Sequence, residues 1–216
     1  MSGPRPLKYY RVGDLCGPDG LAHATADEAR TLGEVSGWIR DYLMSANPDL
    51  GRVGAVCPYT PRAAKLDTIR VGVSDAAPDE TRRIESEMGQ IFRTFDAIES
   101  PPKASYFRTV ITAYPNCIQP EGIAALQRAK RSYRFKAIFG GRMTALFYAG
   151  AEEPGLWNKD FRPLRSPIPL LIIREMVAED AVFAMKQPLL FPFYLWRFPT
   201  PGAKRILELC QSKLVH

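Results

Sequence analysis

Histidine is nearly absent from this chain of 216 residues, which contains only His23 and His216. A zinc or non-haem iron site built on imidazoles would need the last residue as a ligand, and chain ends are where disorder concentrates. A Ser-His-Asp hydrolase would have to use His23, but the sequence has no Gly-x-Ser-x-Gly turn to present a serine. Chemistry that depends on histidine is therefore disfavoured.

Other familiar signals are missing as well. The sequence contains neither of the two common Gly-rich phosphate-binding motifs. No apolar run reaches 18 residues and the first twenty residues lack a secretory signal, so we expect a cytoplasmic protein with no membrane partner. Cysteines are few and never form a Cys-x-x-Cys pair, so we expect free thiols at all four positions, Cys16, Cys57, Cys117 and Cys210.

Positive charge is concentrated in one stretch of the chain. The formal net charge is +6, and residues 101–150 contain eight lysines and arginines but only one acid, Glu121. Such a patch attracts nucleic-acid backbones or small anions. No zinc finger, basic zipper or RNA-recognition motif accompanies it, so we expect a solvated helix face and regard nucleic-acid binding as unlikely.

Hydrophobic periodicity predicts one α+β domain over residues 1–216. Thr25 and Glu28 form a capping box that opens a helix of about twenty residues, ended by Asn47-Pro48. Further helices are predicted over 79–98, 120–138, 178–185 and 203–214, and strands over 68–74, 106–114, 143–149 and 168–174. We expect a mixed sheet of about four strands with helices packed on it.

Two segments carry no regular pattern. Residues 1–24 are rich in proline and glycine and are predicted to be irregular. Residues 150–167 form a long polar connection between two predicted strands, and a connection of that length in a compact domain is usually functional.

Three motifs are chemically suggestive. In Cys57-Pro58 the proline stiffens the chain beside a thiol that could ligate haem iron, although a buried structural thiol is the common alternative. Arg162 and Arg165 are held among prolines and form a fork for carboxylates, unless they pair with internal acids such as Asp160 or Glu175. An aromatic segment could cover a flat cofactor or simply belong to the core, and it comprises Phe191, Phe193, Tyr194, Trp196 and Phe198.

These motifs resemble those of a known group of proteins. The segments Val56-Cys57-Pro58-Tyr59-Thr60-Pro61, Gly155-Leu156-Trp157-Asn158 and Phe161-Arg162-Pro163-Leu164-Arg165-Ser166-Pro167 resemble an uncharacterised bacterial domain family of biosynthetic gene clusters, over roughly residues 50–185. That family is distantly similar to the YqcI/YcgG family, whose members are haem-dependent oxygenases that hydroxylate nitrogen on amino acids or guanidines. The resemblance implies haem, oxygen and an amine-bearing substrate.

The chain departs from the family pattern at two histidines, one near the end of the strand that holds Tyr148 and one at the position of Glu175. The resemblance then implies Cys57 as the axial haem ligand, with Tyr148 and His23 as the alternatives. It also implies that Arg162 and Arg165 hold carboxylates of the cofactor or substrate. Tyr59 and Trp196 are expected to contact substrate.

We therefore expect a haem-dependent oxidative enzyme of specialised metabolism, a monooxygenase or N-oxygenase acting on a small molecule with a carboxylate or amine. The alternative is a cofactor-free protein of the same fold that binds a small anionic metabolite, as a carrier, cyclase or degenerate enzyme. The sequence leaves open whether the protein is a homodimer.

Overall fold

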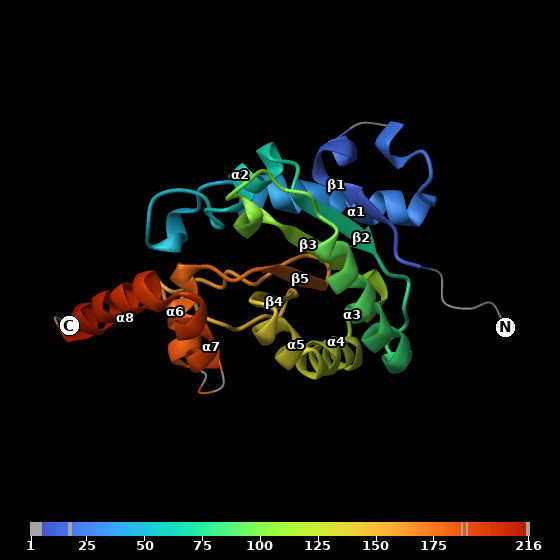
Figure 1. Ribbon diagram of the computed structural model, residues 1–216. Helices are drawn as coiled ribbons and strands as arrows, with labels where there is room; N and C mark the ends of the chain where they lie inside the picture. The colour runs from blue at the N-terminus through green and yellow to red at the C-terminus, as the bar shows by residue number, and fades with distance from the viewer. Residues whose placement is uncertain (1–5, 17–18, 187, 189, 215–216) are drawn as a thin grey trace.

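Five strands form one open mixed sheet at the centre of the computed structural model, which describes residues 6–16, 19–186, 188 and 190–214 (Figure 1). The order is β1-β2-β3-β5-β4; β2 and β3 run parallel and every other neighbouring pair is antiparallel. The strands are β1 (Tyr9–Arg11), β2 (Ile69–Val73), β3 (Thr109–Ala113), β4 (Arg142–Phe147) and β5 (Leu170–Glu175). The predicted α+β class and mixed sheet are confirmed.

One strand more than expected is present because β1 lies in the segment predicted to be irregular. Its residues pair antiparallel with Arg70–Gly72 of β2. A strand of three residues is too short to show a period of two, so only its pairing reveals it. Two 3₁₀ turns, η1 (Val12–Cys16) and η2 (Asp19–Leu21), make up much of the remaining described part of that segment.

Helices cover both faces of the sheet because its central strands are apolar on both sides. Ile69, Val71 and Ile111 face one core, which contains α1 (Ala26–Trp38), the π-helical turn η3 (Ile39–Leu43) and α2 (Thr60–Lys65). Val110, Leu171 and Ile173 face the other, which contains α3 (Thr81–Asp96), α4 (Pro120–Ser132) and α5 (Arg134–Phe139). Figure 1 shows these two helical layers on opposite sides of the sheet. Alternate strand residues therefore belong to different cores.

A local signal sets the start of α1. The Thr25 side chain accepts a hydrogen bond from the Glu28 N–H at 3.3 Å, as the capping box predicts. The helix predicted over 79–98 is present as α3, and its apolar face is buried and contains Ile84, Met88, Ile91, Phe92 and Phe95. The helix predicted over 120–138 is divided at Tyr133 into α4 and α5. Short 3₁₀ turns complete the connections, namely η4 (Pro48–Leu50), η5 (Ser105–Phe107) and η6 (Pro115–Cys117).

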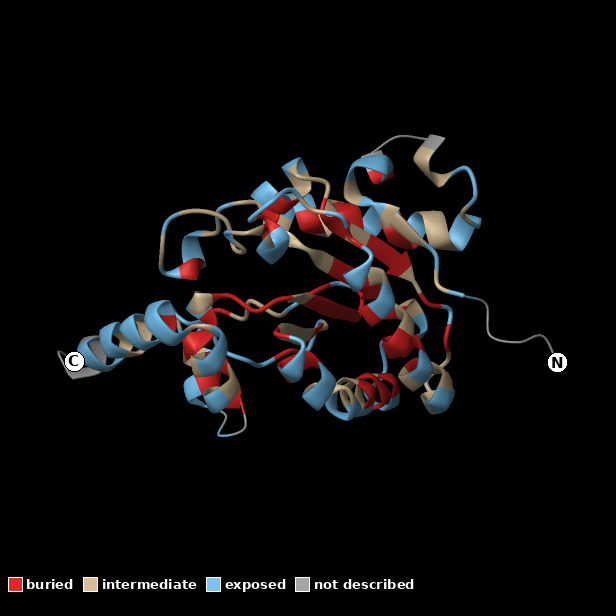
Figure 2. Cartoon of the chain, in the orientation of Figure 1, coloured by how far each residue is buried: buried red, intermediate tan, exposed pale blue. Residues whose placement is uncertain are grey.

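A third, smaller core lies at the C-terminal end. It joins η7 (Ala178–Asp180), α6 (Ala181–Met185), α7 (Leu190–Arg197) and α8 (Pro199–Leu214) to the ends of α5 and β5. The aromatic segment forms the helix α7, apart from Phe198, which follows it. Pro192 is tolerated in the first turn of α7 because the backbone nitrogen at that position has no helical hydrogen bond to donate. Figure 2 shows that α8 is exposed along most of its length. Within the described ranges, no helix is both long and apolar enough to span a bilayer.

Candidate functional site

Cys57 lies in the loop before α2, half-buried against the core that contains α1 and α2. Its N–H donates to the Leu43 carbonyl at 2.9 Å, which fixes the loop to η3. Cys57 interacts electrostatically with the Arg174 guanidinium. Burial opposes the charge on that guanidinium, but Asp180, with contributions from Cys57 and Tyr59, raises its pKa. Cys57 is therefore a free, half-buried thiol near charged protein groups.

The surroundings of Cys57 join the C-terminal helices to the sheet. Arg174, at the end of β5, donates to both carboxylate oxygens of Asp180, at 2.8 and 2.5 Å. The Tyr59 hydroxyl donates to the Glu179 carboxylate at 2.7 Å. Burial and this hydrogen bond raise the pKa of Tyr59, so its phenol stays protonated. Tyr59, expected to contact substrate, already has a protein partner.

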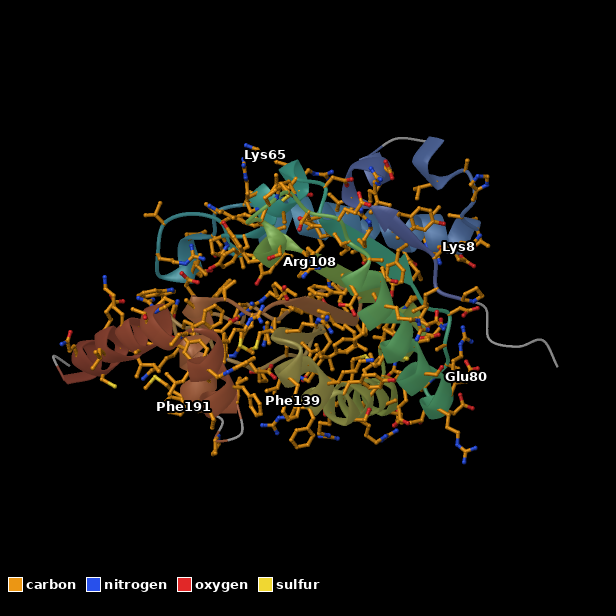
Figure 3. The ribbon with its side chains drawn as sticks, viewed as in Figure 1. Lys8, Lys65, Glu80, Arg108, Phe139 and Phe191 are labelled. Carbon is orange, nitrogen blue, oxygen red and sulfur yellow. The ribbon has the colours of Figure 1, made fainter. Side chains whose placement is uncertain are left out.

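The arginine fork also has an internal partner. Arg162 donates to one oxygen of Glu152 at 3.2 Å, and Arg165 donates to the other at 2.7 Å. These bonds lower the pKa of the Glu152 carboxyl. The structure thus shows both arginines paired with an acid of the same chain, which is Glu152 and not Asp160 or Glu175. Asp160 has no ion pair with either arginine among the described residues, and Glu175 instead accepts from Arg108 at 2.7 Å, near the centre of the molecule in Figure 3.

The remaining predicted contacts lie elsewhere. Trp196 is 78% exposed on α7, and His23 is exposed in the loop before α1; His216 lies outside the described residues. Tyr148 packs on the core of α3 and α4, whereas Cys57 packs on the opposite face of the sheet. The structure does not bring these candidate ligands together.

Haem, which the resemblance implies, does not fit this arrangement. Cys57 and Tyr148, the alternative axial ligands, lie on different faces of the sheet, and the arginines expected to hold the propionates pair with Glu152 instead. Tyr194, from the segment expected to cover a porphyrin, is fully buried in the C-terminal core and donates to the Ala178 carbonyl. Among the described residues, no three His, Cys, Asp or Glu side chains are grouped as metal ligands. Haem binding stays a prediction from the resemblance.

The structure reveals a different site at the end of β4, a pocket of about 210 Å³. Its lining combines one face of α4, the end of β4 and the start of the 150–167 loop, and consists of Gln127, Lys130, Arg131, Leu146, Tyr148 and Glu153. The three α4 residues are spaced i, i+3 and i+4 and so share a helix face. Leu146 and Tyr148 are two apart and so point to the same side of the sheet. Local geometry therefore brings the lining together.

The pocket is rich in unpaired cationic groups. Neither Lys130 nor Arg131 forms a salt bridge or a side-chain hydrogen bond with any residue that the structure describes. Burial lowers the pKa of the Lys130 ammonium; Glu153 opposes this shift and Arg131 adds to it. Two cations, one of them partly desolvated, thus border a space open to solvent, which favours an anionic ligand.

Sequence reasoning missed this pocket. It assigned the charged side of α4 to solvent, and it considered Tyr148 only as a haem ligand. The i, i+3, i+4 spacing of Gln127, Lys130 and Arg131 was available in the sequence, but the strand that faces it was not. A second hollow, of about 520 Å³, is lined by residues 46–48 and 51–54 and contains none of the predicted site residues.

The fold and the pocket define the class, an α+β domain with a small cationic pocket at the edge of a mixed sheet. The chain belongs to the family described as Domain of unknown function (DUF6875), whose model matches residues 32–207. The matched range includes every lining residue of the pocket. No curated protein and no solved structure matches the chain.

Proposed function

We propose that this protein binds a small carboxylate metabolite in the pocket at the end of β4. The observation that supports this is the pair of cations, Lys130 and Arg131, that border the pocket without a described salt-bridge partner. The volume of about 210 Å³ lies below the roughly 300–1,000 Å³ of pockets for drug-sized ligands, so the ligand has few heavy atoms.

The chemistry of the lining favours a carboxylate with a single negative charge. The planar Arg131 guanidinium matches a carboxylate through two parallel hydrogen bonds. Glu153 would repel a dianion such as a phosphate monoester, because it adds negative charge to the same space. The Tyr148 hydroxyl and Gln127 amide supply further hydrogen-bonding groups, and Leu146 supplies an apolar wall.

The test is a titration with lactate, a small carboxylate, followed by calorimetry and by NMR shifts of the α4 amides. We expect saturable binding that Arg131→Ala weakens tenfold to a hundredfold, because a hydrogen bond to a charged group contributes about 1.5–3 kcal/mol. Arg128→Ala is the matched control, since it removes the same charge from the same helix but from outside the pocket. Equal losses in the two variants, or no saturable binding, would refute the proposal.

The haem-dependent enzyme stays as an alternative that the resemblance alone supports. An absorption spectrum of protein expressed with a haem precursor tests it, before and after reduction and addition of carbon monoxide. A thiolate-type spectrum that Cys57→Ser abolishes would favour that hypothesis. Nucleic-acid binding through α4 is the least favoured alternative, and high-affinity oligonucleotide binding lost in both arginine variants would favour it.

A further inference from the structure

We propose that Lys130 forms an imine with the carbonyl group of a 2-oxo acid held in this pocket. The inference rests on the proposed carboxylate binding and adds a covalent step to it. Lys130 and Arg131 are consecutive on α4 and both line the pocket, and a 2-oxo acid carries its carbonyl next to its carboxylate. A carboxylate bound by Arg131 therefore places an electrophilic carbon in the space that Lys130 borders.

The environment of Lys130 favours a nucleophilic amine. The side chain is half-buried beside Leu146 and Tyr148, and no acid of the described chain lies within salt-bridge distance of its ammonium group. The groups that face it are the Arg131 cation, the Tyr148 phenol and the Glu153 carboxylate. Burial and Arg131 lower the pKa of Lys130 while Glu153 opposes them. Desolvation and a neighbouring cation are the two means by which proteins activate a lysine for this reaction.

The step balances without any further reactant. The neutral Lys130 amine attacks the carbonyl carbon, and a C–N bond forms as the C=O π electrons move to oxygen. The nitrogen then loses a proton, the oxygen gains one, and the carbinolamine results. Protonation of its hydroxyl group and loss of water give the iminium ion. Tyr148 and Glu153 both line the pocket and can carry the protons that these transfers require.

The experiment is reductive trapping of the full chain with pyruvate and sodium cyanoborohydride, followed by intact mass and peptide mapping. Hydride addition converts the iminium ion into a stable secondary amine, so we expect one carboxyethyl group, located on Lys130. Lactate has the carboxylate but no carbonyl, so it should compete with labelling without itself being trapped. Arg131→Ala should lower labelling at limiting pyruvate by tenfold or more.

Lys130→Arg tests the chemistry, because it keeps the positive charge but lacks a primary amine. We expect this variant to lose the adduct. Lys136→Arg is the matched control. Lys136 is on α5, outside the pocket, and its ammonium group lies over the rings of Phe92 and Tyr133. Its replacement should leave the labelling of Lys130 unchanged. Unfolding curves of both variants establish that each is folded.

The outcomes distinguish failure of the imine proposal from failure of the proposed carboxylate site. Lactate binding with no adduct, or an adduct shared evenly with Lys136, overturns the imine and leaves the proposed function standing. Labelling of Lys130 that lactate does not inhibit overturns the proposed carboxylate site, and labelling that persists in Lys130→Arg overturns the imine. If lactate does not bind and no adduct forms, both fail.

Discussion

Replacing Asp180 with Asn should destabilise the fold strongly, because this carboxylate links the C-terminal helices to the sheet. The Asp180 side chain is only 3% exposed and accepts two hydrogen bonds from Arg174. It also accepts the Val177 N–H at 2.9 Å and so holds the turn that opens η7. Asn keeps most of the shape and one acceptor oxygen, but it removes the negative charge that balances the guanidinium.

The expected loss in unfolding free energy follows from the burial of the Arg174–Asp180 ion pair. Removing one partner of a buried ion pair costs about 3–5 kcal/mol, because the other charge is left uncompensated. The Arg174 side chain is 30% exposed, so water can take over part of that charge and we expect about 3 kcal/mol, the lower end of the range. For a protein of this size, such a loss lowers Tm by roughly 6–12 °C.

Urea unfolding of Asp180→Asn, Arg174→Met and the double variant Arg174→Met/Asp180→Asn measures this directly. The double variant should lose less than the sum of the two single losses, because no unpaired charge remains. Glu208→Gln is the control, since it breaks the solvent-accessible pair of Glu208 with Arg205 and should cost no more than about 0.5 kcal/mol. A loss below about 1 kcal/mol for Asp180→Asn would refute the structural role assigned to this pair.

Two further predictions concern the core beneath the sheet. Phe92→Ala should cost about 3–5 kcal/mol, measured by urea unfolding, because the ring is fully buried, whereas Phe135→Ala on the exposed side of α5 should change stability by no more than about 0.5 kcal/mol. Burial raises the pKa of Glu87, although Ser74 and Arg83 oppose the shift, so the folded state holds this proton more tightly than the unfolded state. The Glu87 contribution to the free energy of unfolding should therefore be present below about pH 4.3 and be lost as pH rises through the folded pKa. Unfolding curves at several pH values measure this pH dependence, and Glu87→Gln should remove it.

The sequence pattern was sufficient for elements with a long apolar stripe or an apolar, β-branched run. The sequence predicts α3 because apolar residues recur at helical spacing, and it predicts β2, β3 and β5 because short segments rich in apolar and β-branched residues are typical of buried strands. β1 has three residues and owes its existence to pairing with β2, which is a tertiary interaction. The break between α4 and α5 at Tyr133 likewise leaves the apolar line continuous, so periodicity alone gives no sign of it.

The candidate site was less predictable, because partners of charged groups are chosen by folding. Prolines around Arg162 and Arg165 did mark a fixed carboxylate-binding fork, but the carboxylate is the chain's own Glu152. The loop backbone is held against η3, where the Tyr42 hydroxyl donates to the Pro163 carbonyl at 3.2 Å. A rigid loop whose arginines pair with an acid of the same chain and a preorganised ligand site look alike in sequence, since both require the same prolines and arginines.

The position of the pocket explains how Lys130 can be desolvated and still accessible. β4 is an edge strand with β5 as its only neighbour in the sheet, and the chain leaves that edge at Tyr148 to enter the 150–167 loop. α4 packs over the same edge, so Lys130 lies between the apolar layer of the sheet and solvent. A lysine deeper in this layer would lose its route to a ligand, and one farther out on α4 would be fully hydrated and protonated. A sheet edge covered by one helix supplies both conditions, and this position supports the pocket at β4, and not Cys57, as the site of the proposed imine.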